Sequence, residues 1–341
     1  MGTSSLGETD RELNHMTKLE TLVSEGPQPG PLRIVIYGPE GVGKTTLASM
    51  MPAPIFLDAE SSSTDYDLRR IHIPDLATLN TATDLLLSES HPYKTAVIDT
   101  ISKLQLYYEA QACAEKNKKA FADFGWGDGH VLVREKFDLL LYKLDELVRR
   151  GINVVLVGHS IVKRFNPPEL SEGYDRYQIG VGEQAAASIR RWANCVLFVT
   201  YKTTLSINDQ RQARGVGGKK RVILATRAAA YDAKNRVGLP DEIPFEDPQK
   251  LPEALEKLFS VSAVNDQEYR ARLAEAVLKV TEGIDPEVLK AFSIHRGQLR
   301  PDQEFSESPT DWLERIVKFP GGFKKAVEEF RKTSEPAKAN D

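Results

Sequence analysis

A glycine-rich run that ends in lysine and threonine is the segment best suited to chemistry. It reads GPEGVGKT over residues 38–45, which is the G-x-x-x-x-G-K-T spacing of a phosphate-binding loop. Its glycines let backbone N–H groups crowd around an anion, and Lys44 and Thr45 are expected to contact the outer phosphates and Mg²⁺. The predicted ligands of ATP are Gly38, Pro39, Glu40, Gly41, Val42, Gly43, Lys44, Thr45 and Thr46.

A carboxylate that ends an apolar strand is the expected second magnesium ligand. Asp99 follows the run Thr95–Ile98, and such strand ends face ligands in open α/β sheets. The alternative is that Asp99 caps the helix predicted after it. Beside a phosphate loop the magnesium role is favoured, so Thr45 and Asp99 form the predicted metal site.

Glu60 is the expected water-activating group. Many motor ATPases carry a glutamate directly after the magnesium-site aspartate, whereas Thr100 follows Asp99 in this chain. Glu60 instead follows the strand Ile55–Leu57, whose end is expected beside the phosphate loop, so it could deprotonate the attacking water with Asp58 as its structural partner. The alternative is a solvated loop carboxylate.

His159 follows a third apolar strand, Val154–Val157, at the same sheet edge. It is expected to hydrogen-bond the terminal phosphate and to report hydrolysis to the loop after it. A capping histidine is the alternative. The predicted catalytic residues are therefore Lys44, Glu60 and His159.

Short apolar runs that alternate with helical stretches must position these residues. Strands are predicted at Ile34–Tyr37, Ile55–Leu57, Ala96–Ile98, Val154–Val157, Val196–Val199 and Val222–Leu224, and helices at 46–51, 76–88, 101–118, 131–150 and 183–192. This alternation predicts an α/β fold: a mostly parallel sheet flanked by helices, with an antiparallel edge.

Clusters of proline and a change to helical periodicity after the core divide the chain into four predicted segments. Residues 1–31 are a flexible lead-in, 32–246 the P-loop core, 247–333 a small helical appendage and 334–341 a disordered tail. Within the appendage, helical periodicity covers Pro252–Phe259, Gln267–Val280, Asp285–Phe292 and Asp311–Lys332.

Composition narrows the class of protein. The net charge of −4 excludes a generic polyanion binder, so any nucleic-acid contact must come from a local patch. Two cysteines are too few for a disulfide framework, and there is no apolar run long enough to span a membrane. No membrane partner is expected, and the predicted location is the cytoplasm.

The order of these motifs resembles the RecA-like recombinase core. The likeness is greatest to phage-encoded RecA-like ATPases associated with single-strand annealing, and it covers roughly residues 32–240. The resemblance implies that the segment at Glu60 carries the catalytic glutamate and that the strand before His159 senses the γ-phosphate, although recombinases use Gln there. It also implies a host cytoplasm if the chain is phage-encoded.

In RecA-like proteins two loops line the DNA channel, and they correspond here to about 113–130 and 160–182. Basic residues beside aromatic ones suit a single-strand platform. The candidate DNA-binding residues are Lys118, Lys119, Trp126, Lys163 and Arg164. The alternative for the first loop is that its aromatic residues pack the next helix.

The strongest local positive charge lies between Lys202 and Arg236. Residues 214–221 are predicted as a flexible basic hairpin tip that could contact a phosphate backbone. Alternatively, this region could reach the nucleotide of a neighbouring subunit, with Arg227, Lys234 and Arg236 as candidate trans-acting residues. A solvated charged hairpin is the third alternative.

The leading hypothesis is therefore an Mg²⁺-dependent ATPase that acts on single-stranded DNA in recombination or annealing. Expected partners are single-stranded DNA, further copies of the chain in a filament or ring, and a single-strand-binding protein. The alternatives are a helicase or packaging motor, which the threonine after Asp99 disfavours, and a nucleotide-dependent kinase or switch without nucleic acid.

Overall fold

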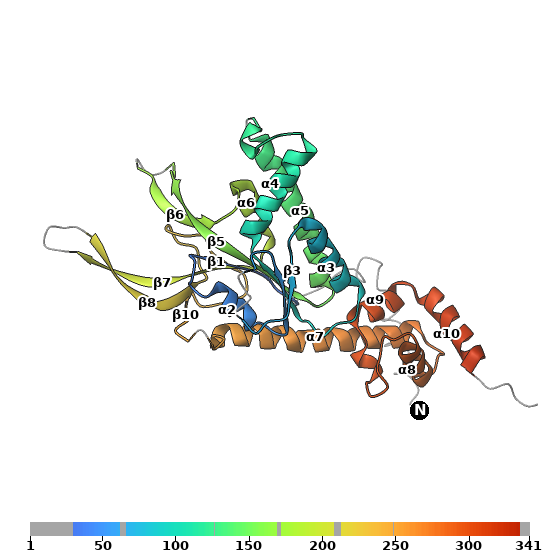
Figure 1. Ribbon diagram of the computed structural model, residues 1–341. Helices are drawn as coiled ribbons and strands as arrows, with labels where there is room; N and C mark the ends of the chain where they lie inside the picture. The colour runs from blue at the N-terminus through green and yellow to red at the C-terminus, as the bar shows by residue number, and fades with distance from the viewer. Residues whose placement is uncertain are drawn as a thin grey trace, which may run out of the picture.

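A ten-stranded sheet organises the computed structural model, which describes residues 30–61, 66–125, 127–168, 172–207, 213–247 and 249–334. The main path of the sheet runs β10-β8-β7-β1-β5-β4-β2-β3, with β6 paired to β5 and β9 paired to β7 (Figure 1). The strands are β1 Arg33–Gly38, β2 Pro54–Asp58, β3 Arg70–His72, β4 Thr95–Asp99, β5 Asn153–Phe165, β6 Tyr174–Ile179, β7 Cys195–Ile207, β8 Ala213–Leu224, β9 Lys234–Asn235 and β10 Glu242–Pro244.

The centre of the sheet is parallel and its far edge is antiparallel, as predicted. β5 lies between β1 and β4, while β7 pairs parallel with β1 and antiparallel with β8. Continuous β-branched runs fit this position because central parallel strands are buried on both faces. The prediction of an α/β fold with a mostly parallel sheet flanked by helices is confirmed.

Helices cover both faces of the sheet. α3 Leu76–Ser88, α4 Ile101–Glu115, α5 Asp128–Arg149 and α6 Glu183–Trp192 share one core cluster with one face. The short α2 Lys44–Ser49 and the start of α7 Glu253–Val280 pack on the other. The parallel strands are therefore held rigidly, and their carboxyl ends meet at one edge.

The C-terminal helices differ from the prediction in two places. α7 is one continuous helix where two separate segments were expected, because no Gly or Pro interrupts residues 253–280. The stretch predicted as one helix over Asp311–Lys332 is split into α9 Thr310–Lys318 and α10 Pro320–Ser334, since Pro320 has no N–H to continue the first helix.

α7 links the sheet to a separate apolar cluster. Leu255 and Phe259 near its start pack under the sheet, while Ala274 and Val277 near its end join α8 Pro286–His295, α9 and α10. Figure 1 shows α7 running beneath the sheet to the group of C-terminal helices. The domain boundary at 246/247 stays a prediction.

Two predicted loops are in fact strands. Residues 160–165 continue β5 and pair with β6, so much of the expected 160–182 loop is a β-hairpin. Residues 214–221, expected as a flexible tip, belong to β8 and pair with β7. Alternating apolar and charged residues explain the first error, since this pattern also fits a half-exposed hairpin strand.

The predicted lead-in and tail lie almost wholly outside the described residues, which begin at Gly30 and end at Ser334. Within the described part of the chain, no helix has both the length and the apolar character needed to cross a membrane.

A buried ion-pair cluster ties β6 and α6 to the loop before β9. Asp232 accepts from Arg176 at 2.6 Å and from Arg190 at 3.1 Å, and its carbonyl accepts from the Tyr37 hydroxyl. Arg176 is only 3% exposed. Loss of Asp232 would therefore leave a buried guanidinium without its carboxylate.

We expect Asp232→Ala to lower the free energy of unfolding by about 3–5 kcal/mol, the usual result of breaking a buried pair from one side. Denaturant melts followed by circular dichroism measure this change. Asp302→Ala is the matched control, because Asp302 and its partner Arg300 are both largely exposed. Equal melting midpoints for the two variants would contradict the assignment.

Candidate nucleotide-binding site

A pocket of ≈ 670 Å³ lies at the carboxyl edge of the parallel strands. The phosphate loop follows β1, Glu60 follows β2, Asp99 ends β4, and His159 lies within β5 where it passes this edge. The lining residues are Glu40, Gly41, Gly43, Lys44, Thr45, Thr46, Glu60, Tyr66, Asp99, Thr100, His159, Arg221 and Gln249. The four segments that the sequence singled out are thus brought together.

The phosphate loop has the close-packed backbone that its glycines permit. Gly43 has φ +97°, a left-handed conformation, and a Cβ at Gly38 would collide with the carbonyl oxygen of Val199. Lys44 is buried, and its Nζ donates to the carbonyl of Pro39 at 2.8 Å. The ammonium group is therefore held inside the loop, at the floor of the pocket.

Asp99 is suited to a divalent cation. Its Oδ2 accepts from the Thr45 hydroxyl at 2.8 Å, whereas its buried Oδ1 accepts no hydrogen bond from any residue that the structure describes. Burial raises the pKa of Asp99 to about 6. A hydroxyl beside a buried, underused carboxylate oxygen is a donor set that fits Mg²⁺.

The capping alternative for Asp99 is wrong, because Thr100 occupies that position. The Thr100 side chain accepts from the backbone N–H of Lys103 at the start of α4. Asp99 is thereby left free of a capping role. Its magnesium role stays a prediction.

Glu60 is held by two donors rather than solvated at random. Its Oε1 accepts from the Thr100 hydroxyl at 2.7 Å and lies 2.8 Å from His159 Nε2. The hydrogen bond with His159 lowers the pKa of Glu60 and raises that of His159. Asp58 accepts the backbone N–H groups of Glu60 and Ser61, which fixes the turn that presents Glu60.

Four lining residues were missed by the sequence interpretation: Thr100 as a partner of Glu60, Tyr66, Arg221 and Gln249. Arg221 is the most informative, since it comes from β8 and its buried Nε has no hydrogen-bond partner among the described residues. Its guanidinium stacks over Tyr201, whose hydroxyl donates to the carbonyl of Gly41. Only the pairing of distant strands could have revealed it.

The candidate DNA-binding residues lie away from this pocket. Lys118 and Lys119 are exposed after α4, Lys163 and Arg164 lie on the β5–β6 hairpin, and Trp126 is outside the described residues. Phe121 packs against Phe124 and His130, as the packing alternative for this loop expected. DNA binding at all five positions stays a prediction.

The candidate trans-acting residues have different surroundings. Arg227 and Arg236 are exposed. The Lys234 ammonium donates to the carbonyls of Arg190, Arg191 and Ala193, so it closes the end of α6 in its own chain. A role for these residues at a neighbouring subunit stays a prediction.

Comparison with known families identifies the domain. Residues 30–237, more than half of the chain, match the family described as AAA domain. The chain belongs to this AAA domain family. The AAA domain spans the ends of β1, β2, β4 and β5 that form the pocket, and it makes the protein a P-loop NTPase by family.

Solved structures give distant matches to the AAA domain protein. The flagellar accessory protein FlaH from Methanocaldococcus jannaschii is 11% identical with a TM-score of 0.34, covering 74% of this chain and 95% of that chain. A KaiC-like protein from Pyrococcus horikoshii OT3 is 14% identical with a TM-score of 0.36, covering 67% and 92%. A search of the curated proteins finds no match.

Proposed function

We propose that this AAA domain protein hydrolyses ATP with Mg²⁺ and couples the reaction to single-stranded DNA in recombination or annealing. The observation that carries the proposal is the contact between Glu60 and His159 at 2.8 Å. It joins the expected water-activating group to the root of the exposed β5–β6 hairpin. One side-chain contact thus links the pocket to a surface element.

The residues of the pocket have separate roles in this reaction. Glu60 takes a proton from water as the water oxygen bonds to the γ-phosphorus, and the bond from that phosphorus to the β–γ bridging oxygen breaks, leaving ADP and phosphate. Lys44 and Arg221 neutralise charge on the phosphate oxygens. Thr45 and Asp99 would hold Mg²⁺, which supplies further charge neutralisation when bound.

Coupling to the hairpin follows from how His159 is anchored. Its backbone N–H donates to Ser102 in α4, and its carbonyl accepts from Gly180 just after β6. A change in the Glu60 carboxylate during turnover would release or tighten the His159 ring, and the backbone of His159 is part of β5 and is bonded to Gly180 after β6. The hairpin would then shift between two arrangements that bind DNA differently.

The hairpin surface has features that suit a nucleic-acid strand. Arg164 and Val162 are exposed on β5, and Tyr177 is 40% exposed on β6. Arg164 lies two residues along from Val162, the cross-strand partner of Tyr177, and contacts Asp175 at 3.8 Å. An exposed cation and an exposed aromatic ring on one hairpin can neutralise a phosphate and stack a base. Assembly into a filament or ring, and contact with a single-strand-binding protein, are further parts of the proposal.

We expect single-stranded DNA to stimulate ATP turnover in the wild type and Lys163→Ala/Arg164→Ala to lose the stimulation while keeping turnover without DNA. Lys324→Ala/Lys325→Ala on α10 removes the same charge elsewhere and is the control. Phosphate release with and without oligothymidylate measures the effect. Turnover that is equal with and without DNA in the wild type would sink the DNA part of the proposal.

A further inference from the structure

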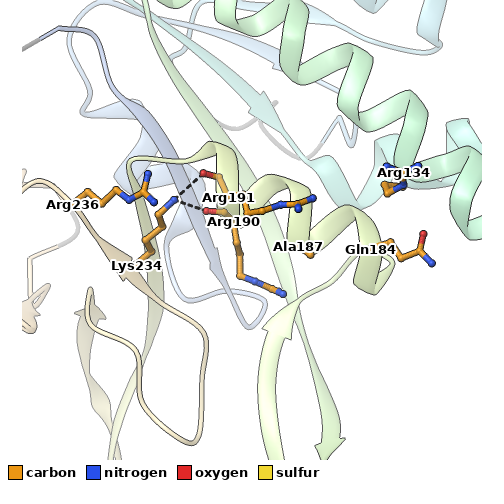
Figure 2. A pocket seen from close by; sticks show the side chains of 7 residues that line it. All are labelled: Arg134, Gln184, Ala187, Arg190, Arg191, Lys234 and Arg236. Atoms are coloured by element: carbon orange, nitrogen blue, oxygen red, sulfur yellow. Dashed lines mark hydrogen bonds between the residues drawn. The ribbon is translucent and has the colours of Figure 1, made fainter. Parts of the chain in front are cut away.

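A second pocket, of ≈ 490 Å³, lies among α5, α6 and β9 and shares no residue with the nucleotide pocket. Five of its seven lining residues are cationic and none is acidic. They are Arg134, Arg190, Arg191, Lys234 and Arg236, with Gln184 and Ala187 completing the wall (Figure 2). This is a marked local excess of positive charge on a chain whose net charge is −4.

Three of these cations already have partners. Arg134 contacts Asp138 at 3.1 Å, Arg190 contacts Asp232 at 3.1 Å, and Lys234 donates to carbonyls at the end of α6. These contacts hold the three side chains in place around the pocket.

The other two cations, Arg191 and Arg236, have no carboxylate partner among the residues that the structure describes. Arg191 donates to the Ser188 hydroxyl at 3.2 Å, and the Arg236 guanidinium contacts no carboxylate in the part of the chain that the structure describes. Burial first, and then the charge of Arg236, lowers the pKa of Lys234. Like charges therefore repel in this pocket, and a bound anion would relieve the repulsion.

The arrangement suits an extended anion rather than a compact one. Figure 2 shows the charged ends spread along α6 and out to Arg236 instead of converging on one point. The ten residues of α6 span about 15 Å at about 1.5 Å per residue. In a duplex each strand carries one phosphate per about 3.4 Å of helix axis, and an extended single strand spaces its phosphates more widely, so this length takes a short run of phosphates rather than one compact anion.

We propose that the five cationic residues of this pocket form a strip that binds the phosphate chain of a single-stranded nucleic acid. α6 begins close to the root of the β5–β6 hairpin, because only three residues separate the end of β6 at Ile179 from the start of α6 at Glu183. A strand held by the hairpin can follow α6 to Arg236. The choice of a nucleic acid rests on the proposed function, whereas the phosphate chemistry of the strip stands without it.

The experiment measures binding of fluorescent oligothymidylate by anisotropy against salt, with linear inorganic polyphosphate as a second probe. For Arg191→Ala/Arg236→Ala we expect at least about tenfold weaker binding and a salt slope shallower by about 1.4, since each phosphate contact on a single strand contributes about 0.7. Arg191→Lys/Arg236→Lys restores the slope. The control Arg149→Ala/Arg300→Ala removes two exposed arginines that pair with Glu146 and Asp302.

Each result has one meaning. Weaker binding of both probes by the double-alanine variant supports the strip as a phosphate-chain site. Weaker binding of oligothymidylate alone supports a site that is specific for nucleic acid. Weakening for polyphosphate alone replaces the nucleic acid by a free polyanion and overturns the choice of strand. Unchanged binding of both probes overturns the strip, and so does wild-type protein that binds neither.

Two further results separate this inference from the proposed function. Binding that depends on Arg191 and Arg236 without any DNA stimulation of ATP turnover would refute the proposed coupling and leave the strip intact. Unchanged binding with a large loss of ATP turnover in Arg236→Ala would assign Arg236 to a neighbouring subunit's nucleotide and overturn the strip.

Discussion

Glu60→Gln is expected to reduce ATP turnover by at least about 100-fold while nucleotide binding is kept. The substitution removes the carboxylate that accepts the proton of water, and general-base groups commonly contribute about 10²- to 10⁴-fold. Glutamine has nearly the same shape and keeps an oxygen that can accept from Thr100, so the turn after β2 should survive. Steady-state phosphate release and binding of a fluorescent ATP analogue measure the two quantities.

Glu40→Gln is the matched control, because Glu40 is an exposed carboxylate that lines the same pocket, and its expected contact with the phosphates is made by its backbone N–H, which the substitution keeps. It changes the local charge equally and touches neither Thr100 nor His159. Turnover should stay within a few-fold of the wild type. If both variants lost turnover equally, the effect would be one of pocket charge and Glu60 would not be the base.

The strands and the loop that form the site were predictable from local sequence. β1, β2, β4 and the start of β5 are short runs of apolar, often β-branched residues, which is the pattern of strands buried on both faces. Once these strands are parallel neighbours, Asp99 and Glu60 must meet at one edge. The placement of these residues at one edge therefore needed only parallel strands, whereas the strand order, in which β5 and β4 lie between β1 and β2, was not predicted.

Contacts between distant residues were not predictable in the same way. Thr100 meets Glu60 across 40 residues, and Arg221 reaches the pocket because its strand β8 pairs with β7, which pairs with the distant β1. These contacts depend on register and on side-chain direction, neither of which a single sequence specifies. The prediction for the β5–β6 hairpin was wrong for a related reason, since its strand pattern was interpreted by analogy with a DNA-binding loop.

Asp99→Asn is expected to stabilise the protein without nucleotide and to abolish the stabilisation that Mg²⁺ and nucleotide give. Burial raises the pKa of Asp99 from 3.8 to about 6, so its ionised form is unfavourable in the folded state. The corresponding free energy is about 3 kcal/mol at neutral pH, at about 1.4 kcal/mol per pH unit. Asparagine keeps an oxygen for the Thr45 hydroxyl and carries no charge.

The raised pKa of Asp99 determines how the stability difference between Asp99→Asn and the wild type changes with pH. A carboxyl whose folded pKa is raised favours the folded state below its unfolded pKa, and that contribution is lost as the pH rises through about 6. The advantage of Asp99→Asn should therefore be constant above about pH 6 and disappear as the pH falls from about 6 to 3.8. Thermal melts across this range measure it, with the exposed Asp84→Asn as the control.

Binding supplies the second half of the same experiment. A ligand that binds only the folded state raises the melting temperature by mass action, and Asp99 is the expected anionic magnesium ligand. Mg²⁺ with a non-hydrolysable ATP analogue should raise the melting temperature of the wild type and of Asp84→Asn, but not of Asp99→Asn. A variant that is more stable alone yet still gains from Mg²⁺ and nucleotide would show that the buried carboxylate is not the metal ligand. The energetic cost of keeping Asp99 charged would then require another explanation.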